Sequence, residues 1–241
     1  RKITMKNAYQ EYGSGPTLVM LHGNGEDGSY FKEQVAHFKE KYHVVTVDTR
    51  GHGKSPRGKA PFTLAQFAKD LKRFLDSHGW KRVILLGFSD GANIAMIFSI
   101  KYPQYVSRLI LNGGNLYPSG VRMVYQIPII CEYVRLRLRS LVDKSVIRKK
   151  ERYDLMVNQP HIKTKYLKRL TMPVLVIAGT HDMIRCSQTR KIYHHIPGAE
   201  LVMMEGDHFI AAKKSRQFNE EVDRFLIEAD WKEVECGDQA L

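Results

Sequence analysis

The chain has 241 residues, of which 43% are hydrophobic, and its 38 Lys and Arg against 25 Asp and Glu give a formal net charge of +13. This length and apolar content suit one large α/β domain with a sizeable core and do not demand a second domain. No apolar run approaches the roughly 20 residues that span a bilayer, and the chain does not open with a charged-then-apolar signal segment, so we expect a soluble protein.

The apolar runs alternate with amphipathic segments along the whole chain. Six runs predict strands, at residues 18–21, 44–47, 83–86, 106–111, 174–178 and 201–204. Helical patterns predict helices at 30–40, 64–78, 89–101, 187–195 and 216–228. Strands that alternate with helices of this length predict an α/β fold, with a mainly parallel central sheet covered by helices on both faces. In such sheets ligands bind at the carboxyl ends of the strands.

The first predicted strand is followed directly by a glycine-rich polar stretch, His22-Gly23-Asn24-Gly25. After the third strand comes the pentapeptide Gly87-Phe88-Ser89-Asp90-Gly91. It has the G-x-S-x-G pattern, in which a strand turns sharply into a helix and presents a serine hydroxyl at the apex. Glycines suit so tight a turn because side chains there would clash with neighbouring elements. An ordinary turn is the alternative, but the flanking strand and helix favour a nucleophile.

Two later strands also lead into residues that can carry acid–base chemistry. The run ending at Ala178 is followed by Gly179-Thr180-His181-Asp182, and the run ending at Met204 by Glu205-Gly206-Asp207-His208. Polar groups therefore follow four of the predicted strands, where the rule for parallel sheets predicts a site.

The three cysteines show no pairing pattern. Cys131, Cys186 and Cys236 are scattered, odd in number and far from any C-x-x-C spacing, so we expect free thiols in a reducing, cytoplasmic setting. The histidines form no metal-ligand spacing, and no glycine-rich phosphate cradle is present. We therefore expect no metal and no cofactor.

Together these motifs resemble those of the serine hydrolases with the α/β-hydrolase fold, specifically the capped, esterase-like members. The resemblance covers nearly the whole chain and includes the turn Asp48-Thr49-Arg50-Gly51-His52-Gly53-Lys54-Ser55, which we interpret as structural. The chain order serine, aspartate, histidine also matches this fold. We predict Ser89 as nucleophile, His208 as general base and Asp182 as the acid that orients the base.

Rival residues exist for the base and for the acid. The alternative interpretation of His208 is an ordinary loop histidine. Five other histidines are weaker candidates for the base: His22, His52, His181, His194 and His195. Asp207 adjoins His208 in sequence, but adjacent side chains rarely meet in the geometry that is needed. Some family members place the acid after the strand that follows the nucleophile helix, where this chain has Asn112-Gly113-Gly114-Asn115 and no carboxylate.

The oxyanion donors follow from the motif and from the resemblance. The backbone N–H of Asp90, the residue after the nucleophile, is one expected donor, and the family pattern maps the second onto the N–H of Asn24. His22 and Gly23 are expected to shape this loop and to contribute to substrate binding. The Asp90 carboxylate has two interpretations, a favourable charge in the first turn of a helix or a selector of amino-bearing substrates.

The long segment between the fourth and fifth strands predicts a helical cap. We divide the chain into a hydrolase core, residues 1–115 and 171–241, and a cap insertion, residues 116–170. Thirteen Lys and Arg but only four Asp and Glu lie in residues 121–170, so most of the excess positive charge is in the cap. This positive charge has three interpretations: a solvated helical surface, a canopy that draws anionic substrates, or a patch that contacts a membrane or an acidic partner.

We expect neither membrane contact nor nucleic-acid binding from the cap. Basic and apolar residues alternate in residues 134–141, which is not the spacing of an amphipathic helix, and no nucleic-acid-binding module is recognisable. Apolar cap residues are predicted either to line an acyl pocket or to pack within the cap: Met123, Val124, Tyr125, Ile127, Ile129, Ile130 and Tyr133.

The predicted function is hydrolysis of a small or medium carboxylic ester, including amino-bearing ones, through an acyl-enzyme and without a cofactor. The alternatives on the same triad are a peptidase or amidase and a thioesterase. A different class, a ligand-binding receptor or signalling protein on a hydrolase scaffold, also stays open. The partner is a small-molecule ester or amide, and the sequence makes no prediction of oligomeric state.

Overall fold

The structure, a computed structural model, describes the backbone of residues 6–238 and the side chains of residues 6–229. Seven strands form the sheet: β1 (Tyr9–Tyr12), β2 (Thr17–Leu21), β3 (His43–Val47), β4 (Val83–Phe88), β5 (Val106–Asn112), β6 (Val174–Gly179) and β7 (Glu200–Met204). The helices are α1 (Lys32–Phe38), α2 (Leu64–His78), α3 (Asp90–Lys101), α4 (Met123–Arg139), α5 (Ile147–Asn158), α6 (Cys186–His195), α7 (Ile210–Lys213) and α8 (Ser215–Asp238). Short 3-10 helices include η1 (Gly28–Phe31), η3 (Pro118–Gly120) and η5 (Thr164–Arg169).

The strand order is β1-β3-β2-β4-β5-β6-β7, and every neighbouring pair is parallel except β1 with β3. This confirms the predicted α/β class with a mainly parallel sheet. The six predicted strands all form. The seventh, β1, is an edge strand with the sequence YQEY, whose side chains are largely exposed. Its polar composition explains why the sequence pattern does not predict it.

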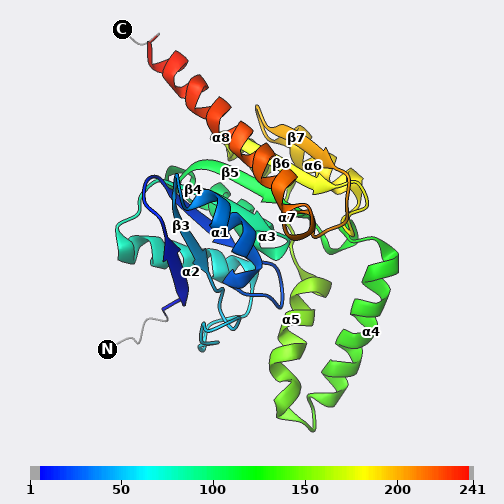
Figure 1. The fold of residues 1–241 in the computed structure, drawn as a ribbon. Helices are drawn as coiled ribbons and strands as arrows, with labels where there is room; N and C mark the ends of the chain where they lie inside the picture. The colour runs from blue at the N-terminus through cyan, green and yellow to red at the C-terminus, as the bar shows by residue number, and fades with distance from the viewer. Residues whose placement is uncertain (1–5, 239–241) are drawn as a thin grey trace.

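Two hydrophobic clusters cover the two faces of the sheet, because successive side chains of a strand point to opposite sides. On β4, for example, Leu85 belongs to the cluster that includes α2, α3 and α6, whereas Ile84 and Leu86 belong to the cluster that includes α1 and α8. In Figure 1, α1 and α8 cross the face of the sheet nearer the viewer. The central strands β4, β5 and β6 are buried throughout, which matches their continuous apolar sequences.

The predicted cap segment contains α4 and α5, which project from the sheet as an antiparallel pair (Figure 1). Helix α5 is tied to the core by side chains. The Arg57 guanidinium binds both carboxylate oxygens of Glu151, at 2.8 and 2.7 Å, and Gln159 accepts a hydrogen bond from the N–H of Leu64. Helix α4 is the outer member, and its polar contacts to α5 include the Tyr133 hydroxyl on Asp154.

The end of the predicted cap segment packs in the core. Ile162, Leu167 and Leu170 are buried in the hydrophobic cluster on the α2 and α3 side of the sheet. Along the described part of the chain, no helix is long and apolar enough to cross a membrane.

Candidate active site

The turn from β4 into α3 holds Ser89 in a conformation that side chains rarely adopt. Its φ is 55° and its ψ is −119°, and among the described residues it is the only non-glycine with a positive φ. A Cβ added at Gly87 would overlap the carbonyl oxygen of Gly91, and one added at Gly91 would overlap the carbonyl oxygen of Leu21. Both glycines of the motif are therefore required by close backbone approach.

Ser89, His208 and Asp182 form one chain of hydrogen bonds. The distance from Ser89 Oγ to His208 Nε2 is 3.0 Å, and that from His208 Nδ1 to Asp182 Oδ1 is 2.7 Å. Because ionised Asp182 can only accept, its bond places the imidazole proton on Nδ1 and leaves Nε2 free to accept the serine proton. Asp182 Oδ1 also accepts from the N–H of Ile184 at 2.8 Å, which fixes the carboxylate.

The rival acid and the glycine stretch after β5 have other contacts. Asp207 binds the ammonium group of Lys213 and the N–H of Phe209, and the bond from Lys213 lowers the pKa of its carboxyl. At Gly113, with φ 64°, an added Cβ would lie 2.8 Å from Cε1 of His208. The stretch without a carboxylate thus provides room for the imidazole.

The two predicted oxyanion donors belong to the elbow itself and to the loop after β2. The ends of β2 and β4 are neighbours, with Leu21 opposite Gly87, so the loop that carries Asn24 lies beside the elbow. Within the described residues, neither the backbone N–H of Asn24 nor that of Asp90 donates to a protein acceptor. Two unpartnered N–H groups beside a serine hydroxyl can stabilise an oxyanion.

His22 lies behind this loop. Its Nδ1 donates to the carbonyl oxygen of Gly23 at 2.7 Å, its Nε2 accepts from the N–H of Thr49 at 3.0 Å, and burial lowers its pKa. It is not among the residues that line the cavity at Ser89, whereas Gly23 is. That His22 contributes to substrate binding stays a prediction, and its contacts are those of a buried side chain that supports the loop.

The Asp90 carboxylate is held by amides rather than by a cation. Asn24 Nδ2 donates to Asp90 Oδ2 at 3.1 Å and also to the carbonyl oxygen of Arg152 in α5 at 2.8 Å. Asn93 Nδ2 approaches the other carboxylate oxygen at 3.4 Å. Burial raises the pKa of Asp90, while these two amides oppose the rise. The carboxylate keeps free lone pairs, because each of its oxygens can accept two hydrogen bonds.

Glu26 is a site residue that the sequence analysis misses. Its Oε2 accepts from the N–H of Gly23 at 3.1 Å, it lines the cavity, and burial raises the pKa of its carboxyl. Its residue type alone does not distinguish Glu26 from an ordinary loop acid. Its place directly after the His-Gly-Asn-Gly stretch is the one available signal.

A cavity of about 220 Å³ opens at Ser89. Its lining includes Gly23, Asn24, Glu26, Ser89, Asp90 and His208. The rest of the lining is largely apolar. From the core it includes Phe88, Asn115, Met183, Ile184 and Phe209, and from the predicted cap segment Val121, Ile129, Met156 and Gln159. Of the apolar cap residues considered from sequence, Ile129 lines this cavity. The lining contains two carboxylates and neither Lys nor Arg.

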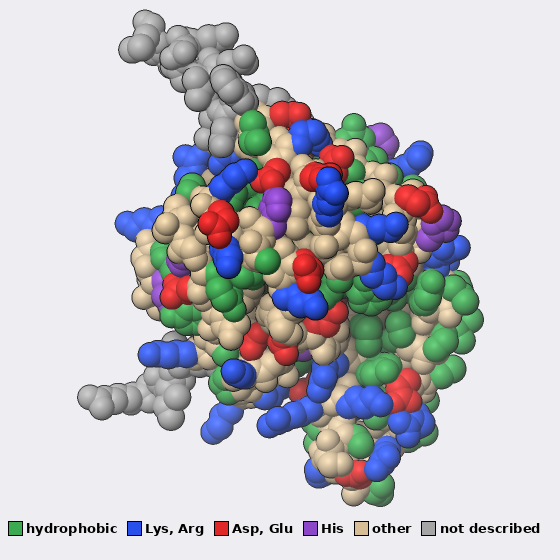
Figure 2. Space-filling view, in the orientation of Figure 1, with side chains coloured by type: hydrophobic (Ala, Val, Ile, Leu, Met, Phe, Trp, Pro, Cys, Tyr) green, Lys and Arg blue, Asp and Glu red, His purple; other side chains and the backbone are tan. Residues whose placement is uncertain are grey.

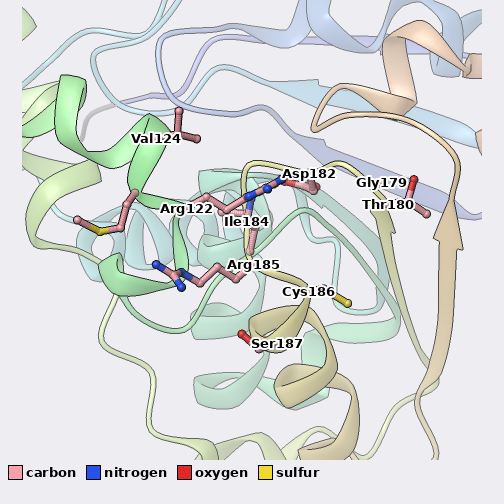
Figure 3. A pocket seen from close by; sticks show the side chains of 10 residues that line it. Arg122, Val124, Gly179, Thr180, Asp182, Ile184, Arg185, Cys186 and Ser187 are labelled. Atoms are coloured by element: carbon pink, nitrogen blue, oxygen red, sulfur yellow. The ribbon is translucent and has the colours of Figure 1, made fainter.

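A larger hollow of about 620 Å³ lies near the loop that carries Asp182 (Figure 3). Its lining includes Arg122 before α4 together with Arg185, Cys186 and Ser187 at the start of α6. Asp182 and Ile184 also line it, and Ile184 lines the cavity at Ser89 as well, whereas Ser89 and His208 line only the smaller cavity. Over the described residues, no group of three or more His, Cys, Asp or Glu is arranged to hold a metal ion.

Comparison with known proteins adds four findings. The sequence profile of the α/β-hydrolase fold matches residues 16–128. The human serine hydrolase BPHL is 29% identical over 240 aligned residues, which cover 90% of this chain and 82% of that protein. Among solved structures, the enol-lactonase from Burkholderia xenovorans LB400 has a TM-score of 0.76 at 23% identity, covering 92% of this chain and 96% of that one. Est816, described as an N-acyl homoserine lactone degrading enzyme, has a TM-score of 0.75 at 24% identity, covering 93% and 98%.

Proposed function

We propose that this chain, which belongs to the α/β-hydrolase fold family, is a serine hydrolase that cleaves a carboxylic ester through an acyl-enzyme. The observation that carries the proposal is the hydrogen-bonded chain from Ser89 Oγ through the His208 imidazole to the Asp182 carboxylate, with distances of 3.0 and 2.7 Å. A serine hydroxyl is a weak nucleophile at neutral pH, and this arrangement supplies the base that activates it.

In the acylation step, Ser89 Oγ attacks the ester carbonyl carbon while its proton moves to Nε2 of His208. The carbonyl oxygen becomes an oxyanion, which the N–H groups of Asn24 and Asp90 would stabilise. Loss of one such donor typically costs about a hundred- to a thousand-fold in rate. Asp182 stabilises the imidazolium, which then gives its proton to the departing alkoxide.

In the deacylation step, a water molecule takes the place of the alcohol. His208 removes one proton from this water as its oxygen attacks the acyl carbon, and a second tetrahedral oxyanion forms in the same place. Collapse of this intermediate breaks the bond to Ser89 Oγ, and the imidazolium returns the proton to that oxygen. The products are a carboxylic acid, an alcohol and the free enzyme.

The cavity supports the narrower proposal of a small or medium, amino-bearing substrate. At about 220 Å³ it is below the usual range for drug-sized ligands, about 300–1,000 Å³. Glu26 and Asp90 both line it, and burial raises the pKa of both carboxyls. A bound ammonium group would offset that burial, whereas an anion would be repelled. These carboxylates favour a cationic over an anionic substrate.

Two measurements test the proposal. A fluorophosphonate probe should label the wild-type protein and fail to label Ser89→Ala or His208→Ala. A folded wild-type protein that stays unlabelled would favour the receptor or signalling alternative. A series of ester, thioester and amide substrates with a common acyl group then separates the esterase from the thioesterase and the peptidase or amidase on the same triad.

Substrate charge is tested on matched aminoacyl and plain acyl p-nitrophenyl esters. Asp90→Asn should lower kcat/KM for the aminoacyl ester by about ten- to a hundred-fold relative to the plain ester, because a hydrogen bond to a charged group contributes about 1.5–3 kcal/mol. Asp207→Asn is the matched control, since Asp207 lies outside the cavity lining. An unchanged ratio in Asp90→Asn would leave the carboxylate with only its structural role at the start of α3.

A further inference from the structure

Helix α4 carries an exposed apolar face on the side turned away from α5. We call the α4 stripe the set of apolar side chains that recur every three or four residues along the helix and just past its end: Met123, Ile127, Ile130, Val134, Leu138 and Leu141. Their exposed fractions run from 38% to 75%. At about 100° per residue these positions share one side of the helix. Soluble helices normally turn such a side toward a core.

The opposite side of α4 packs on the rest of the protein. Gln126 and Leu136 are buried, and the Tyr133 hydroxyl donates to Asp154 of α5 at 2.7 Å. Lys149 of α5 binds Glu132 at 2.8 Å. Helix α4 is therefore already seated on the protein by one face, and in the described structure nothing covers the other. Figure 2 shows hydrophobic side chains gathered over α4, with Lys and Arg toward the far end of the hairpin.

The charges beside the α4 stripe are mainly positive. At about 100° per residue, Arg137 falls on one border of the stripe and Arg135 on the other. Arg139 follows near the end of the helix, and all three are exposed. The acidic residues nearby are engaged: Glu132 binds Arg135 and Lys149, and Asp143 binds Arg139. Over residues 121–170 thirteen Lys and Arg stand against four Asp and Glu.

We propose that the α4 stripe docks on an anionic lipid surface, with α4 lying in the plane of the interface. An apolar face bordered by arginines is the pattern of interfacial helices, which bury the apolar side chains among the acyl chains and hold the cations at the headgroups. At about 1.5 Å per residue, the 17-residue helix is about 25 Å long and presents the stripe along most of that length. A second copy of this chain fits less well, because stripe-to-stripe contact would bring arginine borders together.

The helical spacing of the α4 stripe removes the alternation in residues 134–141 as a reason to expect no membrane contact. In the sequence, basic and apolar residues alternate along residues 134–141. In the structure residues 134–139 are helical, so Val134 and Leu138 lie on one side, with Arg135 and Arg137 on its borders. The inference does not depend on hydrolase activity, since none of these residues lines the cavity at Ser89.

Flotation with phospholipid vesicles tests the docking. The full chain should float with vesicles of phosphatidylcholine and phosphatidylglycerol, and much less with phosphatidylcholine alone. Replacing two stripe residues, Val134→Asp with Leu138→Asp, should weaken partitioning at least about tenfold, because it replaces buried apolar surface by charge. Arg135→Gln and Arg137→Gln should each weaken it roughly fivefold, the equivalent of about 1 kcal/mol per basic residue.

A control variant and three outcomes make the test decisive. Ile227 of α8 is 51% exposed and lies far from α4 in sequence, so Ile227→Asp should float like the wild type. An unchanged circular dichroism spectrum and unchanged thermal unfolding show that the stripe variant is folded. Three results would each overturn the proposal. The first is equal binding to neutral and anionic vesicles, and the second is full binding by the stripe variant. The third, which would favour self-association, is a dimer in light scattering that Leu138→Asp dissociates.

Discussion

Replacement of Ser89 by glycine should give a more stable protein than replacement by alanine. Both variants lack Oγ and the hydrogen bond to His208, so both should be inactive, and they differ only in the Cβ. At φ 55° and ψ −119° that Cβ is strained against the backbone, and glycine adopts this conformation without strain.

The magnitude follows from two opposing contributions. A non-glycine residue held in a sparsely populated backbone region costs about 1–3 kcal/mol. Relief of this strain by glycine is partly offset, because glycine loses more conformational entropy on folding than alanine, which costs about 0.5–1 kcal/mol. Ser89→Gly should therefore exceed Ser89→Ala by about 1 kcal/mol in the free energy of unfolding, or by about 2–4 °C in Tm for a chain of this size.

Urea unfolding followed by circular dichroism measures the difference. Ser99, buried in the interior of α3, provides the matched control, since glycine there should be less stable than alanine by about 1 kcal/mol. If the alanine variant at position 89 equalled or exceeded the glycine variant while the control pair behaved as expected, the strain assigned to the elbow would be wrong.

Two further changes probe the surroundings of the elbow. Gly91→Ala should lower the free energy of unfolding by about 1–3 kcal/mol or more and remove probe labelling, because the added Cβ would overlap the carbonyl oxygen of Leu21 and displace Ser89. Urea unfolding measures the first effect and fluorophosphonate labelling the second. A variant that behaves like the wild type in both assays would contradict the tight packing. His52→Phe should flatten the acid side of the stability profile. Burial lowers the pKa of His52 from 6.5 to about 4. Between pH 6.5 and about 4, His52 is therefore protonated in the unfolded chain but not in the folded protein. Its contribution to the free energy of unfolding is fully present above pH 6.5 and is lost as the pH falls toward 4. Urea unfolding should show that the variant loses about 2 kcal/mol less than the wild type between about pH 7 and pH 5, and an equal loss would exclude His52 as its source.

The sequence predicts the parts of the fold that depend on apolar patterning. Helix α2 has the predicted bounds of 64–78, begins at Thr63, whose side chain accepts from the N–H of Gln66, and ends at Gly79 with φ 70°. Ser89, Asp182 and His208 all follow predicted strands, and ligands bind at the carboxyl ends of parallel strands, so the sequence predicts that these residues lie together. In the structure they are hydrogen-bonded. The catalytic roles of these residues stay predictions that the probe labelling tests.

The remaining features depend on contacts between distant segments, which patterning does not contain. Glu26 becomes part of the site because its carboxylate folds back onto the N–H of Gly23. His22 turns out to be a buried support because Thr49, far along the chain, donates to it. The α4 stripe emerges only when residues 123–139 are placed on one helix whose other side packs on α5.

The hydrogen bond from Asn24 to α5 ends on a main-chain carbonyl, that of Arg152, not on a side chain. A backbone acceptor is present whatever residue occupies position 152, as long as the helix forms. Substitutions at position 152 that keep α5 helical should therefore leave this attachment of the predicted cap segment to the loop beside Ser89 in place. Replacement of Asn24 by a residue without a side-chain N–H donor should release it, because this bond needs the amide of position 24.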